Sequence, residues 1–249
     1  MTYNVHGCRG RDRQWSPQRI VDVIAPAKPD IVALQELDIR RARSGGVDQA
    51  ELIAAALGMR VEFHPALQVM EEMYGDAILT ACPSRLVKSG PLPGLGRLRN
   101  LEPRGALWAA IEVDGSELQV INTHLGLLAR ERQKQIDLLL GPDWLGHPKC
   151  RDPVILLGDF NTRPRSRGYR RLTRRLKDAQ RFHRRRGQPT FPARFPALRL
   201  DYAFVGPTIE VLRAETLRTP LARIASDHLP LVIDLEIDPA VSQLHQAAQ

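Results

Sequence analysis

Short apolar runs recur along the chain, separated by polar segments and by segments that contain glycine or proline. Continuous apolar runs of this length are typical of buried strands. The sequence therefore predicts strands over residues 31–36, 77–79, 108–113, 118–122, 154–157, 202–205 and 231–237. Asp114-Gly115 separates two of these runs, and this dipeptide is typical of a tight hairpin turn.

Helical segments lie between these runs. Ser16 followed by Pro17 predicts a helix start, because serine caps helices and proline suits the first helical position. Further helices are predicted over residues 49–57, ended by Gly58, and over residues 130–140. Hairpins join the strands as often as helical crossovers do. We therefore expect one α/β domain of the α+β kind over residues 1–237, with two packed mixed β-sheets flanked by helices, and a C-terminal tail over 238–249.

Composition narrows the class of protein. A hydrophobic fraction of 43% with 26% charged residues excludes a disordered or fibrous chain. The three cysteines form no CxxC pair, which argues against a disulfide framework and a cysteine zinc site and favours the reducing cytoplasm. We expect neither a transmembrane segment nor a signal peptide. The net charge of +8 favours an anionic partner.

Polar side chains gather where the predicted strands begin or end. Strand ends at one sheet edge bring distant residues into a single cleft. The residues placed in this way are Asn4, His6, Gln35, Glu36, Asn122, His124, Asp159, Asn161, Asp201, Asp227 and His228. Carboxylates without cysteine suit Mg²⁺ or Mn²⁺, and histidine beside a carboxylate supplies acid–base chemistry. Together these groups predict metal-assisted hydrolysis of a phosphate ester.

Each of these segments also has a purely structural explanation. Glu36 could be a surface acid, residues 158–161 a turn, and residues 226–228 a cap before a strand. The functional interpretation is favoured because metal-type or acid–base residues stand at five strand edges at once.

With these residues identified, the chain resembles the endonuclease/exonuclease/phosphatase superfamily, whose fold is the DNase I-like four-layer sandwich. The motifs that carry the resemblance run in family order from near the first residue to residue 230. They are Thr2-Tyr3-Asn4-Val5-His6-Gly7, Leu34-Gln35-Glu36, Tyr74-Gly75-Asp76-Ala77-Ile78-Leu79, Thr123-His124-Leu125, Gly158-Asp159-Phe160-Asn161, Arg199-Leu200-Asp201-Tyr202 and Ser226-Asp227-His228-Leu229-Pro230.

The resemblance implies a role for each matching residue. Glu36 would be the principal metal ligand, with Asn4 and Asp227 near the metal. Asp159 and Asn161 would orient the attacking water and hold the phosphate. His124 would stabilise the transition state or act as an acid, and His228, paired with Asp201 or Asp227, would be the second catalytic imidazole. His6 is expected to contact the substrate.

The chain departs from the family pattern at Asp76, where the family usually has asparagine. This carboxylate either raises the pKa of His124 or is a harmless variation.

Arginines dominate residues 163–186, where Tyr169, Leu172 and Leu176 recur at helical spacing behind Ser166 as a cap. This segment is either a solvated surface helix or an anion-binding face beside the cleft. In the second case Arg163 and Arg165 would bind substrate, with Arg104 contributing from another loop. The aromatic residues expected near the site, Tyr169, Phe191 and Phe195, do not form a stacking platform for bases.

Three functions follow from these features. The favoured one is a Mg²⁺-dependent nuclease, a phosphodiesterase of nucleic acid. The second keeps the chemistry but places it on a phospholipid, a sphingomyelin-like lipid or an inositol phosphate at an anionic membrane surface. The third is a basic nucleic-acid-binding protein without catalysis, against which the complete set of site residues argues.

Overall fold

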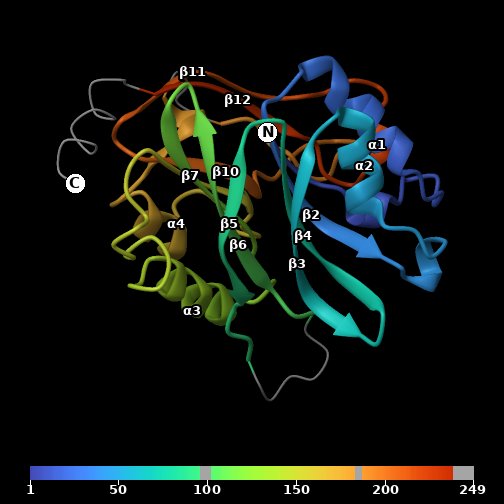
Figure 1. The fold of residues 1–249 in the computed structure, drawn as a ribbon, viewed down its shortest axis with the longest axis horizontal. Helices are drawn as coiled ribbons and strands as arrows, with labels where there is room; N and C mark the ends of the chain where they lie inside the picture. The colour runs from blue at the N-terminus through green and yellow to red at the C-terminus, as the bar shows by residue number, and fades with distance from the viewer. Residues whose placement is uncertain (96–101, 183–186, 238–249) are drawn as a thin grey trace.

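Two six-stranded mixed sheets pack face to face in the computed structural model, which describes residues 1–95, 102–182 and 187–237 (Figure 1). The first sheet has the order β11-β12-β1-β2-β4-β3. Its strands are β1 (Thr2–Asn4), β2 (Ile31–Ile39), β3 (Arg60–Val69), β4 (Glu72–Thr80), β11 (Ile209–Thr216) and β12 (Leu231–Ile237). The chain therefore enters this sheet at its start and returns to it at the end of the described residues.

The second sheet is built from the middle of the chain and has the order β5-β6-β7-β8-β10-β9. Its strands are β5 (Ser84–Pro91), β6 (Gly105–Val113), β7 (Ser116–His124), β8 (Val154–Asp159), β9 (Lys177–Asp178) and β10 (Asp201–Val205). The predicted hairpin at Asp114-Gly115 joins β6 to β7, with positive φ at both turn residues.

Helices cover the outer face of each sheet. The α-helices are α1 (Pro17–Ile24), α2 (Gln49–Leu57), α3 (Ala129–Leu139), α4 (Arg167–Leu172) and α5 (Ala222–Ala225), and single 3₁₀ turns span His6–Cys8, Ala25–Ala27, Ala42–Ser44 and Ala179–Arg181. In Figure 1, α1 and α2 lie on the right against the first sheet, whereas α3 and α4 lie on the left beside the second. The predicted four-layer sandwich is therefore confirmed, and the predicted tail over 238–249 lies outside the described residues.

Three hydrophobic cores correspond to the three interfaces between these layers. Apolar residues of α1 and α2 pack with those of β1, β2 and β4 in one outer core, and α3 and α4 pack with β6, β7, β8 and β10 in the other. The inner faces of the two sheets share the third. Burying these apolar surfaces is the main source of stability in such a fold.

Local sequence signals set the helix boundaries. The Ser16 hydroxyl accepts a hydrogen bond from the Arg19 amide at 3.2 Å, as expected for a capping residue. The carboxylate of Asp48 caps α2 in the same way, and Gly58 ends that helix with φ of 67°. Positive φ is accessible to glycine without steric cost, which explains the glycine at this position.

The helix predicted in the arginine segment is shorter than its apolar spacing suggests. Only residues 167–172 are helical, and the chain then turns into β9. Tyr169, Leu172 and Leu176 are nevertheless buried, since Leu176 packs from the turn rather than from the helix. Residues 183–186 of this segment lie outside the described residues.

A buried polar bridge joins the two sheets. The Gln35 side chain on β2 donates to the Asn122 side-chain oxygen on β7 at 2.8 Å. The Asn122 amide donates in turn to the carbonyls of Leu34, at 2.9 Å, and Ala77, at 2.8 Å. Buried amides need such partners, so this bridge holds the sheets in one relative position. Gln35 and Asn122, which the sequence places beside strand ends, lie in this bridge between the sheets.

In the described ranges, every helix is too short or too polar to cross a membrane.

Candidate active site

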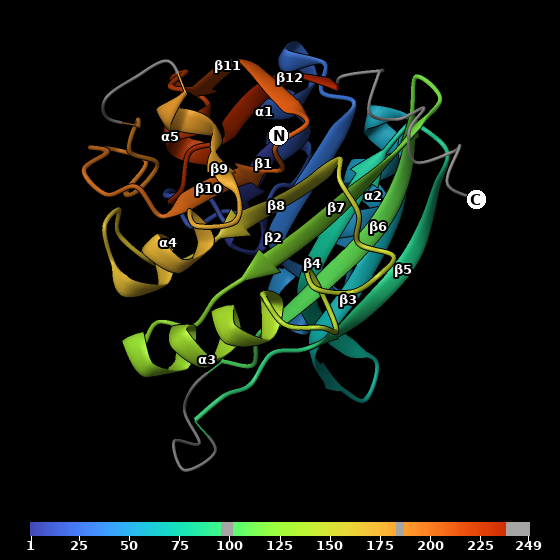
Figure 2. The same ribbon diagram turned by 90° about the vertical axis from the view of Figure 1, so that its left-hand side faces the viewer.

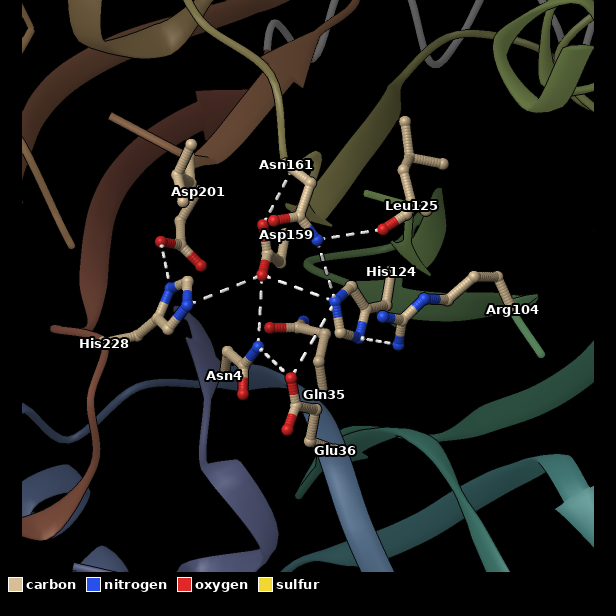
Figure 3. Close-up of polar contacts among 12 residues, drawn as sticks. Asn4, Gln35, Glu36, Arg104, His124, Leu125, Asp159, Asn161, Asp201 and His228 are labelled. Carbon is tan, nitrogen blue, oxygen red and sulfur yellow. Dashed lines mark hydrogen bonds and ion pairs between the residues drawn. The ribbon is translucent and has the colours of Figure 1, made fainter. Parts of the chain in front are cut away.

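Strand ends from both sheets converge at one edge of the sandwich, beside α4 and α5 in Figure 2. In the second sheet, His124 ends β7, Asp159 ends β8 and Asp201 begins β10, and the register places Asp159 between the other two. The first sheet contributes Asn4 from the end of β1, Glu36 from β2, and His228 from just before β12. Figure 3 shows these side chains pointing toward one another.

Glu36 projects into this centre because β2 is irregular at that point. The pairing of β2 with β4 shifts register between Leu34 and Leu37, and Glu36 has φ of 63°. Glu36 was predicted at the end of a strand over residues 31–36, but β2 continues to Ile39 and Glu36 lies at a bulge within it. Bulges are typical where a strand must redirect a side chain, and a left-handed non-glycine residue here is strained.

Asn4 links the two sheets at the centre. Its side-chain amide donates to the Glu36 carboxylate at 2.9 Å and to the Asp159 carboxylate at 3.1 Å. Its side-chain oxygen accepts from the amide of His6 at 3.0 Å. Asn4 therefore fixes the separation of the two carboxylates.

Asp159 is the buried hub of the site. One carboxylate oxygen lies 3.4 Å from Nε2 of His124 and 3.7 Å from Nε2 of His228, and the other accepts the amide hydrogen of Asn161 at 2.9 Å. Burial raises the pKa of Asp159 to about 7, although the nearby His228 charge and the hydrogen bonds oppose this change. A carboxylate with a pKa near neutrality is suited to exchanging a proton with water.

His124 is held as a neutral imidazole. Arg104 Nη1 lies 3.0 Å from its Nδ1, and the side-chain amide of Asn161 lies 3.1 Å from its Nε2. Both neighbours present N–H groups, which disfavours a ring with protons on both nitrogens. Burial, followed by the charges of Arg104 and His228, lowers the pKa of His124 well below its usual value. Of the two alternatives for Asp76, a raised pKa of His124 is therefore not observed.

His228, in contrast to His124, is paired with a carboxylate, that of Asp201. Nδ1 of His228 lies 2.9 Å from Oδ2 of Asp201, and both side chains are buried. Burial alone would lower the pKa of His228, but the carboxylates of Asp201 and Asp159 outweigh it and raise the pKa to about 10. His228 is therefore a cation at neutral pH, beside a neutral His124. The alternative partner, Asp227, lies instead 3.8 Å from His6, and both of those side chains are partly exposed.

The remaining predicted residues differ in their exposure and in their distance from the centre. Arg104 is buried behind His124 rather than exposed to a substrate, and its other contact is Glu102 at 3.0 Å. Arg163 and Arg165 are exposed on the segment between β8 and α4. Asp76 is buried on β4, where its carboxylate accepts the Glu36 amide hydrogen at 3.4 Å, and burial raises its pKa to about 8. Asp76 therefore supports the bulge that presents Glu36.

Sequence reasoning missed two aromatic residues beside the centre. Trp15 and Tyr74 line a cavity that also contains Glu36. Tyr169, expected near the site, packs in the outer core, whereas the ring of Phe191 lies 4.8 Å from that of His228. Trp15 follows a run of polar residues outside any periodic pattern, so the sequence did not predict that it lies near the site.

The buried carboxylates offer hard oxygen donors of the kind that Mg²⁺ and Mn²⁺ prefer. Ligand atoms of Asp159, Asp201 and His228 all lie within 4.8 Å of one another. The second carboxylate oxygen of Asp201 has no hydrogen-bond partner among the described residues. The carboxylates at this edge fit a bound divalent cation, whereas protonated His228, already paired with Asp201, is not one of its ligands.

The four-layer sandwich fold and the acid–imidazole centre together define the class of protein as a phosphohydrolase. The family model for the endonuclease/exonuclease/phosphatase family matches residues 1–228, and the chain belongs to that family. Members of this family are hydrolases that act on phosphate esters.

Individual relatives share this organisation at modest identity. The uncharacterized protein YbhP of Escherichia coli is 27% identical over 251 residues, which cover 95% of each chain. Among solved structures, a mannosyl-6-phosphatase of Bacteroides thetaiotaomicron has 22% identity and a TM-score of 0.74, with 95% of this chain and 98% of that chain covered. The human Nocturnin catalytic domain has 23% identity and a TM-score of 0.70, with coverage of 94% and 92%. These structural likenesses show the shared fold.

The His228–Asp201 pair predicts a change in pH dependence. Replacing Asp201 with asparagine removes the charge that contributes most to raising the pKa of His228, so the imidazole should lose its proton at lower pH. If protonated His228 is the active form, the alkaline limb of kcat/KM against pH should move down by about one to three pH units. Profiles between pH 6 and 10 with a chromogenic phosphodiester would measure this. An unmoved alkaline limb would contradict the pairing.

Proposed function

We propose that the chain is a divalent-metal-dependent phosphodiesterase that cleaves nucleic acid by attack of water. The observation that carries this proposal is the buried acid–imidazole centre together with the exposed arginines that follow its member Asn161 in the chain. The centre supports hydrolysis of a phosphate ester, and the arginines favour a polyanionic substrate.

The metal would be held by Glu36, with Asn4 and Asp227 beside it. Glu36 is partly accessible at the β2 bulge, and its carboxylate has no ion pair with lysine or arginine in the described ranges that would neutralise it. Mg²⁺ is the favoured ion and Mn²⁺ the alternative, because all the nearby acids are hard donors. When bound, such an ion neutralises charge on the phosphate oxygens.

The protein groups divide the proton transfers between them. Asp159, with its raised pKa and its hydrogen bond from the Asn161 amide, is placed to orient the attacking water and accept its proton. The water oxygen forms a bond to phosphorus while the bond to the leaving oxygen breaks, and that oxygen then takes a proton from solvent. Protonated His228, held by Asp201, stabilises the charge that develops on the phosphoryl oxygens. His124 is neutral and is held in place by its contact with Arg104.

Exposed arginines provide the preference for a polymer. Arg163, Arg165 and Arg167 follow Asn161 within six residues and are exposed, as are Arg170, Arg174 and Arg175 further along. Arginine binds phosphate in a bidentate manner, so successive backbone phosphates suit such a segment. Arg171 is paired with Asp137 and is not part of this set.

Two exposed leucines favour a second candidate function on lipids. Leu127 and Leu128 are exposed, and they follow Leu125, whose carbonyl accepts a hydrogen bond from Asn161 at 2.9 Å. Apolar residues beside cationic ones suit an anionic membrane surface. A phospholipid or a related phosphate ester is therefore the alternative substrate.

The test is cleavage of labelled single-stranded and duplex DNA and RNA in the presence of Mg²⁺, with the double variant Arg163→Ala/Arg165→Ala assayed beside the parent. We expect the parent to cleave nucleic acid. The variant should bind more weakly, with a salt dependence reduced by about one unit of slope for each lost phosphate contact.

The matched control is Arg85→Ala, because Arg85 is exposed on β5 and paired with Glu117 at 2.9 Å. This variant should behave as the parent does. Intact nucleic acid with every metal, together with hydrolysis of anionic phospholipid vesicles, would replace the nuclease by the lipid alternative. Binding without cleavage of any ester would indicate the non-catalytic function.

A further inference from the structure

A cavity of about 180 Å³ lies beside the acid–imidazole centre, with Glu36 in its lining. It is lined by His6, Arg9, Trp15, Asp38, Arg43 and Tyr74, together with Glu36. The cavity is smaller than the pockets of drug-sized ligands and offers room for one ring system. Because Glu36 borders both the cavity and the acid–imidazole centre, a group in this cavity would adjoin a phosphate held at the centre.

Most of the charge in the cavity is already neutralised by pairing. Arg43 donates to both oxygens of Asp38 at 2.8 and 2.7 Å, and Asp38 is fully buried. Glu102 at the edge of the cavity is paired with Arg104. Arg9 is the lining cation without a carboxylate partner among the described residues.

Two polar groups of the cavity have no partner within the described chain. Tyr74 is only 3% exposed, and its buried hydroxyl makes no hydrogen bond within the described residues. Nε of Arg9 is likewise buried without an acceptor. Both atoms are shielded from solvent, so the open surface of the cavity comes from the partly exposed side chains of Arg9 and Trp15.

Trp15 gives the cavity an aromatic wall. The indole is 41% exposed, and the Arg9 guanidinium lies 5.0 Å from its ring centroid. The indole therefore offers an aromatic face with a cation beside it. Planar heterocycles with hydrogen-bonding edges bind to such surfaces by stacking.

We propose that this cavity binds a single nucleobase attached to the nucleotide at the scissile phosphate. The base stacks on Trp15, and its edge accepts a hydrogen bond from the Arg9 guanidinium. This inference rests on the proposed function, since it identifies a nucleotide as the occupant of the site.

The experiment is a binding titration without turnover, in EDTA, with adenosine 5′-monophosphate and ribose 5-phosphate as the two probes. Trp108 and Trp144 are 1% and 2% exposed, so a change in tryptophan fluorescence on adding nucleotide reports on Trp15. We expect adenosine 5′-monophosphate to quench the fluorescence and to bind about tenfold more tightly than ribose 5-phosphate, which lacks the base.

Variants separate stacking from general effects on the fold. By calorimetry, Trp15→Ala should lose the tenfold preference for adenosine 5′-monophosphate and keep the affinity for ribose 5-phosphate, whereas Trp15→Phe should retain most of the preference. Equal affinities of the two probes for the parent, or an unchanged preference in Trp15→Ala, would overturn the proposal.

This titration is independent of the cleavage assay. Base-dependent binding without cleavage of nucleic acid would reject the nuclease while leaving the cavity as a base site. Cleavage of nucleic acid without base-dependent binding would leave the nuclease and reject the cavity.

Discussion

Replacing His228 with alanine is expected to lower kcat/KM for phosphodiester hydrolysis by about 10²- to 10⁴-fold. The imidazole is buried, lies 2.9 Å from Asp201, and stays protonated through its two neighbouring carboxylates. Its removal takes a fixed positive charge from the place where the phosphoryl oxygens become more negative. The effect should therefore appear mainly in kcat.

The loss at His228 can be distinguished from general damage to the fold. His147→Ala is the matched control, because the His147 ring packs against the edge of Trp108 at 5.6 Å, outside the acid–imidazole centre. We expect this variant to keep near-parental activity. Near-normal turnover by His228→Ala, with cleavage still dependent on metal, would show that the centre described here is not the catalytic one.

Replacing Glu36 with glutamine is expected to abolish measurable turnover and to weaken metal binding by at least about tenfold. Glutamine has nearly the same shape, so the Asn4 contact at 2.9 Å can be kept while the charge is lost. If Glu36 is the principal ligand, the Mg²⁺ concentration that gives half-maximal activity should rise sharply.

Direct Mn²⁺ binding by calorimetry provides the measurement that does not depend on activity. Glu51→Gln is the matched control, since Glu51 is exposed in the first turn of α2. Unchanged metal affinity in Glu36→Gln would move the ligand set to the cluster of Asp159, Asp201 and His228. In that case the pairing of His228 with Asp201 would need another explanation.

Much of the fold could be predicted from the sequence because its signals are local. The cap at Ser16, the glycine at 58 and the Asp114-Gly115 turn each act over a few residues, and the structure has a helix boundary or a turn at each. The length of α4 was not predictable in this way, since buried Leu176 continues the helical spacing from a turn. Apolar spacing reports burial and not the backbone conformation that achieves it.

The candidate site was predictable in its members more than in its arrangement. His124, Asp159 and Asp201 adjoin because of strand register, and the parallel pairing of β7 with β8 follows from a crossover that the sequence indicates only weakly. The choice of Asp201 over Asp227 as the partner of His228 depends on a few ångströms of backbone. Trp15 reaches the cavity through a loop, and loop geometry has no periodic signal.

The order of strands has a consequence for the assembly of the centre. β1 lies between β2 and β12, so one edge of β1 has no partner until residues 231–237 are also in place. His228 lies just before that segment, after every other member of the centre in chain order. The centre is therefore complete only when this last segment docks against β1.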